Sequence, residues 1–187
     1  ALLTRTRSLK AGITRTKTHA AATFLQSETA APFVAIDVAA APEGICLRVP
    51  AERLYRELVP FGPAYRNIQG ELLVGNDGAL AEIVCPDPAS VEAPLRLGSP
   101  FALDAAFHAA CVWGQHHHGV VAFPMAVGER RIYAFTKPGG RYFARIMPVR
   151  TSPDLLVFDI WLIDEKGRLR ETARNVEMRA PGGGRLK

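Results

Sequence analysis

The most uniform stretch of hydrophobic residues lies in the middle of the chain, at residues 101–113. Almost every position in it is apolar, which predicts a helix that is buried on nearly all sides. Pro100 stands just before this stretch, where a proline fits the first turn of a helix, and Gly114 follows it as a natural stop. The pattern therefore predicts one central helix over Phe101–Trp113.

Hydrophobic and polar residues alternate on both sides of this helix with the two-residue period of β-strands. Before it, residues 68–74 and 79–84 flank Gly75-Asn-Asp-Gly78, a strong hairpin signal. A short amphipathic helix is expected at 51–58. After the central helix, strands are expected near 119–127, 130–136, 141–150, 154–163 and 168–179. This order indicates the α+β class, with one long antiparallel sheet wrapped around one helix.

The two ends of the chain differ from this central region. Residues 1–26 alternate loosely and are rich in threonine, which predicts two strands joined at Gly12. Two strands do not make a stable unit alone, so we expect them to pair with something else. We expect residues 27–46, rich in alanine and proline, to be a linker, 47–180 to be a domain, and 181–187 to be a flexible tail.

Composition and charge exclude several classes of protein. Hydrophobic residues make up 48% and charged residues 22% of the chain, as in globular proteins with one sizeable core. The net charge is +5, but the basic residues are scattered and lack interleaved aromatic residues. This disfavours a nucleic-acid partner and suits an acidic protein partner. No apolar run approaches the ~20 residues of a membrane span. The three cysteines lie in apolar runs without metal-ligand spacing, which favours a reduced, cytoplasmic protein.

Two polar residues interrupt the central helix. Asp104 and His108 are four residues apart and therefore project from one face, with Cys111 one turn further along. Burying a carboxylate is costly unless it is paired or hydrogen-bonded. One interpretation is a satisfied Asp–His pair that holds the helix against a loop. The other is a carboxylic acid whose pKa is set by an apolar site and that serves in acid–base chemistry.

Three motifs occur in an order that is typical of one protein family. They are Tyr55 followed by Phe61-Gly-Pro-Ala-Tyr65, then Leu103-Asp-Ala-Ala-Phe-His108, then Val121-Ala-Phe-Pro124. Together they resemble the second half of a polyketide synthase dehydratase domain, which is a double hotdog. The resemblance implies that residues 47–180 are the C-terminal hotdog and that residues 1–26 are the closing strands of the preceding one.

The resemblance also implies a function. Dehydratases of this family eliminate water from a 3-hydroxyacyl chain on an acyl carrier protein and leave a 2-enoyl thioester. By motif, Asp104 would be the catalytic acid and His108 the catalytic-site group hydrogen-bonded beside it. Phe61, Tyr65 and Pro124 would lie along the acyl channel. No metal and no cofactor is implied beyond the phosphopantetheine that carries the substrate. The expected partners are the acyl carrier protein, other synthase domains, the N-terminal hotdog half and a second copy in a homodimer.

One feature of the family is missing. The base that takes the C2 proton is a histidine of the first hotdog, and the family's spacing would place it upstream of Ala1. We therefore expect the catalytic pair to be incomplete in the isolated chain, and whether that chain alone is active stays open. The segment Gln115–Pro124 matches only the glycine and proline of that histidine motif, which we interpret as coincidence. We expect His116, His117 and His118 in a polar loop, because three adjacent histidines cannot all face one metal ion.

Two alternatives to a dehydratase remain open. One is a non-catalytic hotdog that binds acyl intermediates or serves as a scaffold; it would fold and bind acyl chains without eliminating water. The other is a product-template-like domain, which uses the same double hotdog and the same pair of residues to guide the cyclisation of a polyketide chain.

Overall fold

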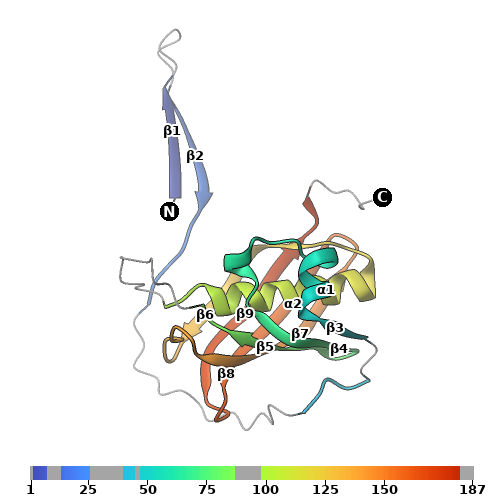
Figure 1. Ribbon diagram of the computed structural model, residues 1–187. Coiled ribbons are helices and arrows are strands. Elements are labelled where there is room, and N and C mark those ends of the chain that lie inside the picture. Colours follow the sequence, from blue (N-terminus) through green and yellow to red (C-terminus); the bar gives the residue numbers. More distant parts are fainter. Residues whose placement is uncertain (1, 8–13, 26–39, 45–46, 87–97, 182–187) are drawn as a thin grey trace. The chain divides into compact units, whose positions relative to one another are not determined.

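The computed structural model describes residues 2–7, 14–25, 40–44, 47–86 and 98–181 (Figure 1). The chain divides into two units, Ala1–Ala30 and Ala31–Lys187. Most of the expected linker at 27–46, and all of the expected tail at 181–187 except Pro181, lie outside the described residues.

The described part of the first unit is a two-stranded antiparallel sheet. Strand β1 (Leu2–Arg7) pairs with β2 (Thr14–Ala20), so both strands expected within residues 1–26 are present. Every residue of β2 is exposed within this chain. A side-chain contact of 2.6 Å joins Thr4 Oγ1 to His19 Nε2 across the two strands. That these strands close a preceding hotdog stays a prediction.

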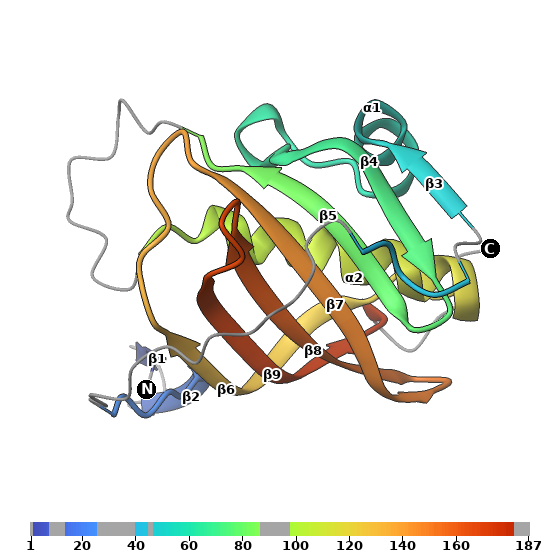
Figure 2. The same cartoon turned by 90° about the horizontal axis from the view of Figure 1, so that it is seen from below.

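Among the described residues, the second unit is built on a seven-stranded antiparallel sheet. Its strands are β3 (Leu47–Pro50), β4 (Ile68–Gly75), β5 (Gly78–Val84), β6 (Phe123–Ile132), β7 (Arg141–Ser152), β8 (Leu155–Asp164) and β9 (Leu169–Arg179). Their order is β3-β4-β5-β7-β8-β9-β6, so β3 and β6 form its edges. Figures 1 and 2 show the sheet curving around helix α2 (Phe101–His118), as the sequence predicts.

The segment between β3 and β4 is helical, as expected for residues 51–58. Helix α1 (Ala51–Arg53) continues directly into a π-helical turn, η1 (Leu54–Leu58), and a 3₁₀ turn, η2 (Pro63–Tyr65), follows. The π turn buries Tyr55. π-helical turns are rare in proteins, and those that occur are often found at functional sites.

Helix α2 extends beyond the predicted end at Trp113. It continues through Gly114 and ends before Gly119, whose φ of 64° lies in the left-handed region that favours glycine. Gly114 serves packing instead, because a Cβ at this position would lie 2.5 Å from Cδ1 of Leu156. The predicted stop at Gly114 is therefore wrong. A glycine that permits close packing looks the same in sequence as one that ends a helix.

Strand β6 replaces the two strands predicted at 119–127 and 130–136. The expected break falls at Gly128, but this glycine stays within the strand, beside Asn175 of β9. A Cβ on residue 128 would lie 2.9 Å from Cβ of Asn175, which has a positive φ of 51°. Gly128 therefore permits a close approach of two strands and does not end one. The strands expected near 141–150, 154–163 and 168–179 are confirmed as β7, β8 and β9.

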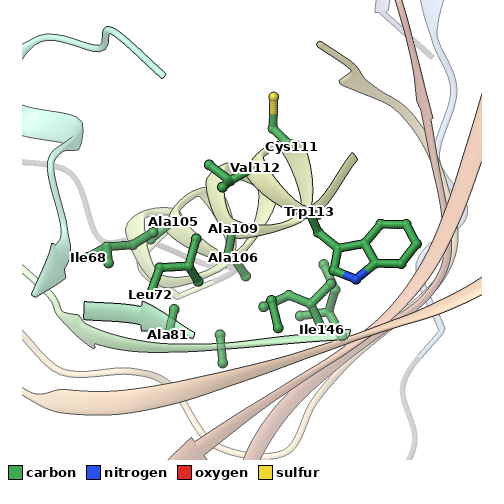
Figure 3. Packing of buried hydrophobic residues seen from close by; sticks show 14 of the residues in the cluster. Ile68, Leu72, Ala81, Ala105, Ala106, Ala109, Cys111, Val112, Trp113 and Ile146 are labelled. Carbon is green, nitrogen blue, oxygen red and sulfur yellow. The ribbon is translucent and has the colours of Figure 1, made fainter. Parts of the chain in front are cut away.

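The hydrophobic core lies between α2 and the sheet. Figure 3 shows Ala106 and Ala109 of α2 directed toward Leu72 and Ala81 of the sheet, whereas Cys111 points away from them. The four core residues are fully buried. Small side chains on the sheet-facing side of the helix let it lie close to the strands. Within the described residues, no helix has both the length and the hydrophobicity that crossing a membrane requires.

Candidate active site

One face of α2 lines a pocket of about 270 Å³. Asp104, Phe107, His108 and Cys111 recur on this face with the three- and four-residue spacing of a helix. The full lining consists of Val59, Phe61, Asp104, Phe107, His108, Cys111, Ala122, Phe123, Pro124 and Met178. Apart from the carboxyl of Asp104 and the imidazole of His108, the lining is apolar, so it suits an apolar ligand with a reactive polar group.

Asp104 and His108 lie side by side, as their spacing predicts. Asp104 Oδ2 and His108 Nε2 are both buried and 3.2 Å apart, without the alignment of a hydrogen bond. The side chain of His108 is 4% exposed, whereas that of Asp104 is 32% exposed. The Asp104 carboxyl therefore has one buried oxygen beside the imidazole and an exposed part at the pocket.

Desolvation dominates the electrostatics of this pair. Burial raises the pKa of Asp104 above the ordinary value of a carboxyl group and lowers the pKa of His108 to about 4. Both shifts favour the neutral forms, because a low-dielectric environment penalises charge. The site therefore favours a neutral carboxylic acid beside a neutral imidazole, and such an acid can donate a proton to a ligand.

Two aromatic residues from the segment before β4 surround the His108 ring. Phe61 stacks on it with 4.5 Å between the ring centroids. Tyr55 meets it edge-on, and its Oη lies 3.4 Å from Nδ1 of His108. The same Oη accepts a hydrogen bond from the backbone N–H of Ile68 at 3.0 Å. Desolvation raises the pKa of Tyr55 to about 12, so this hydroxyl keeps its proton.

Of the residues predicted from sequence, Asp104, His108, Phe61 and Pro124 come together at the pocket. Tyr65 is not among the lining residues. It is 44% exposed, and its ring centroid lies 6.4 Å from that of Phe61. The structure thus places Tyr65 beside the pocket, next to a residue that lines it.

Several lining residues were not predicted as site residues. They are Val59, Phe107, Cys111, Ala122, Phe123 and Met178. Phe107 and Cys111 share the helix face of Asp104, so helical spacing was a sufficient signal for them. Met178 comes from β9, and its place at the pocket depends on how the sheet curves, which no local pattern encodes.

The three adjacent histidines are not in a loop. His116, His117 and His118 form the last turn of α2, so the expected polar loop is wrong. His117 Nε2 lies 3.1 Å from the carbonyl oxygen of Gly75, and its ring packs on Trp113. The helix continues here because Gly114 does not end it. Within the described residues, no group of three or more His, Cys, Asp or Glu side chains is arranged to hold a metal ion.

Comparison with solved structures places this fold among dehydratase domains. A trans-AT polyketide synthase dehydratase domain from Brevibacillus brevis is similar at 23% identity and a TM-score of 0.67, over 83% of this chain and 56% of that one. The dehydratase domain of RzxB from Pseudomonas fluorescens is similar at 21% identity and a TM-score of 0.61, over 82% and 55%. The chain spans about half the length of these relatives.

Sequence comparison gives the family. No curated protein sequence matches the chain significantly. A family model described as "Polyketide synthase dehydratase N-terminal domain" matches residues 37–186, which is most of the chain and nearly all of its second unit. The described strands and α2 of that unit have the hotdog fold of the solved dehydratase domains. The chain therefore belongs to the polyketide synthase dehydratase family.

Proposed function

We propose that this chain is a dehydratase region of a polyketide or polyunsaturated fatty acid synthase. It eliminates water from a 3-hydroxyacyl chain on an acyl carrier protein and gives a 2-enoyl thioester. The observation that carries this proposal is the position and the pKa of the Asp104 carboxyl. It lies at an apolar pocket, its pKa is raised by burial, and the neutral imidazole of His108 lies beside it. A carboxylic acid held neutral by its environment can protonate a leaving hydroxyl group.

In the proposed reaction, a base removes the proton from C2, and the electron pair of that bond forms the C2–C3 double bond. The C3–O bond breaks, and the leaving hydroxyl takes the proton of Asp104 and departs as water. Asp104 is then a carboxylate and the base is protonated, so a proton transfer back to Asp104 resets the site. The reaction consumes no oxidant or reductant, and we propose no cofactor beyond the phosphopantetheine of the carrier protein.

The proposed base is a histidine of the N-terminal hotdog half, as the family resemblance implies. Asp104 lies in the first turn of α2, whereas His116, His117 and His118 lie in its last turn, so these three are poor candidates. His108 serves as the partner of Asp104. Phe61 and Pro124 would contact the acyl chain, with Tyr65 at the channel entrance.

We propose that the described hotdog is the C-terminal one, because its Asp motif opens α2. The family model that matches it is described as an N-terminal domain, so this assignment rests on the Asp motif and not on the match. The edge strand β6 would pair with the N-terminal half. Phe123, Met125 and Val127 of this strand are 42%, 68% and 39% exposed within the chain. Without that half, a second copy would take its place and form a homodimer. The other proposed partners are an acyl carrier protein and further synthase domains. We propose a cytoplasmic location, where the free, buried Cys85 and Cys111 would stay reduced.

The proposed function is tested by following 2-enoyl thioester formation from a 3-hydroxyacyl-pantetheine substrate by ultraviolet absorbance. The full chain is assayed together with its N-terminal hotdog half. Asp104→Asn keeps the shape of the side chain and removes the acid, so we expect turnover to fall about 100-fold or more. Asp154→Asn, in the exposed turn between β7 and β8, is the matched control and should not change turnover.

The alternatives give different results in this assay. A folded protein that binds acyl-pantetheine but forms no 2-enoyl product is an acyl-binding or scaffold hotdog. Cyclised products from a poly-β-keto thioester indicate a product-template-like domain. Equal turnover of the wild type and Asp104→Asn would reduce Asp104 to a structural residue and overturn the proposed mechanism.

A further inference from the structure

Tyr55 contacts His108 but has no part in the proposed reaction. It lies in the π-helical turn η1 and is 3% exposed. Its hydroxyl accepts the backbone N–H of Ile68 at 3.0 Å. The oxygen therefore already accepts from a backbone donor, and its own proton is left to donate. Nδ1 of His108, 3.4 Å away, is an acceptor within reach of that proton.

The Tyr55 contact determines where His108 carries its proton. A neutral imidazole has one N–H, and the contacts of its two nitrogens decide which of them carries the hydrogen. If Nδ1 accepts the proton of Tyr55, the hydrogen of His108 must lie on Nε2. The ring is neutral because burial lowers its pKa to about 4. The protonated Nε2 then lies 3.2 Å from Oδ2 of Asp104, without the alignment of a hydrogen bond.

This tautomer in turn determines where Asp104 carries the acid proton. Oδ2 is buried and lies 3.2 Å from the protonated nitrogen, so a second hydrogen is disfavoured there and the carboxylic hydrogen lies on Oδ1. The Asp104 side chain is 32% exposed although Oδ2 is buried, so the exposed part of the carboxyl includes Oδ1. The acid proton is then on the oxygen that a ligand in the pocket can reach.

We propose that Tyr55 is a positioning residue that sets the Nε2–H tautomer of His108 and so keeps the acid proton of Asp104 on its pocket-facing oxygen. In the opposite tautomer, Nδ1–H would meet a hydroxyl that already accepts the backbone N–H of Ile68. It would also leave Nε2 without a hydrogen beside Oδ2, which favours the acid proton of Asp104 on that buried oxygen. The tautomer rests on these contacts and on the neutral state of the buried ring, whereas its effect on turnover rests on the proposed function.

The tautomer is measured by long-range ¹H–¹⁵N NMR on the full chain labelled with ¹⁵N-histidine. The chain has five histidines, and the His108 signals are those that disappear in His108→Gln. We expect His108 of the wild type to be the Nε2–H tautomer and Tyr55→Phe to give a mixture that includes Nδ1–H. A wild-type Nδ1–H tautomer, or an unchanged tautomer in Tyr55→Phe, overturns the proposal.

A matched control separates this effect from the loss of a buried hydroxyl. Tyr142 is also buried, and its Oη accepts the backbone N–H of Lys137 at 2.7 Å, but it lies on β7 and has no contact with His108 among the described interactions. Tyr142→Phe therefore removes an equivalent hydrogen bond. We expect it to leave the His108 tautomer unchanged. An equal change in both variants would mean that general destabilisation, and not positioning, moves the tautomer.

Kinetics then test the effect on the acid. We expect Tyr55→Phe to lower kcat about 10-fold with little change in KM, the size of one lost positioning hydrogen bond. In a His108→Gln background the same substitution should lower kcat far less, because an amide has a fixed donor and no tautomer. Equal losses in both backgrounds would contradict a role through His108. If the tautomer shifts in Tyr55→Phe but neither the wild type nor any variant makes product, the proposed function fails and the Tyr55 assignment stands.

Discussion

At the scale of single residues, the burial of His108 makes folding sensitive to acid. Its pKa in the folded chain, about 4, lies below the ordinary 6.5, so the unfolded chain binds this proton more readily. The stability that the neutral ring contributes is complete above the unfolded pKa and is lost as the pH falls from 6.5 through about 4. The shift corresponds to about 3 kcal/mol.

We therefore expect His108→Gln, which does not titrate, to lose less unfolding free energy than the wild type between about pH 7 and pH 4. The side chains that face the ring, Asp104, Tyr55 and Phe61, are the same in both proteins. Urea unfolding of the full chain at a series of pH values measures the difference. Parallel pH profiles would show that His108 is not desolvated as described.

Asp104 has the opposite dependence on pH. Burial raises its folded pKa, so its contribution to stability is fully present below the unfolded pKa and is lost as the pH rises through the folded value. Asp104→Asn stays neutral at every pH. Its unfolding free energy should therefore increase relative to that of the wild type as the pH rises from the unfolded pKa of Asp104 through the raised folded pKa. The same substitution should also remove turnover. A variant that is inactive and also less stable than the wild type at neutral pH would indicate a structural role.

The predictability of this site from sequence also differs from residue to residue. The pairing of Asp104 with His108 followed from helical spacing alone, because both residues lie on one helix. The contact of Tyr55 with His108 did not, because 53 positions separate the two residues. It depends on a π turn and on the packing of that turn against α2, neither of which leaves a periodic signal.

At the scale of elements, two glycines of similar appearance have different roles in α2. Gly114 allows the helix to pack on Leu156, whereas Gly119 ends it with a positive φ and has no neighbouring atom within 4 Å of an added Cβ. We expect Gly114→Ala to lower the unfolding free energy by about 1–3 kcal/mol through overpacking. Gly119→Ala should cost about 1 kcal/mol through backbone strain.

A double-mutant cycle distinguishes the two causes. Leu156→Val shortens the side chain that Gly114 contacts, so it should recover part of the loss in Gly114→Ala and none of the loss in Gly119→Ala. Urea unfolding of the single and double variants gives the coupling free energies. Additive losses in both pairs would show that Leu156 does not limit the packing at position 114.

Alternation predicted most strands but misplaced their limits where a glycine had a tertiary role. The β4–β5 hairpin was predicted correctly, because Asn76 and Asp77 form a short turn that depends only on these neighbouring residues. The single strand β6 was not predicted, because two strands were expected, with a break between residues 127 and 130 where Gly128 stands. Gly128 allows β6 to approach β9 closely, and only the assembled sheet reveals that role. Features set by neighbouring residues, such as this turn, could therefore be predicted from the sequence, whereas contacts between distant segments could not.

At the scale of the whole molecule, the two edges of the seven-stranded sheet differ. Strand β3 has four residues, whereas β6 has ten and carries the exposed Met125 and Val127. A long edge with exposed apolar side chains favours pairing with another strand. The first residues of β6, Phe123 and Pro124, also line the pocket. A partner on this edge would therefore adjoin the proposed active site, where the N-terminal half is expected.

The last prediction follows from this edge. We expect the full chain alone to form a dimer through β6, and we expect Val127→Lys to convert it to a monomer because a charge on the edge disfavours pairing. Val149→Lys is the control. Val149 is 55% exposed on β7, and two strands separate β7 from β6 in the sheet. Light scattering gives the mass of each protein. A wild-type monomer, or a dimer that both lysine variants weaken equally, would therefore remove β6 as the pairing edge.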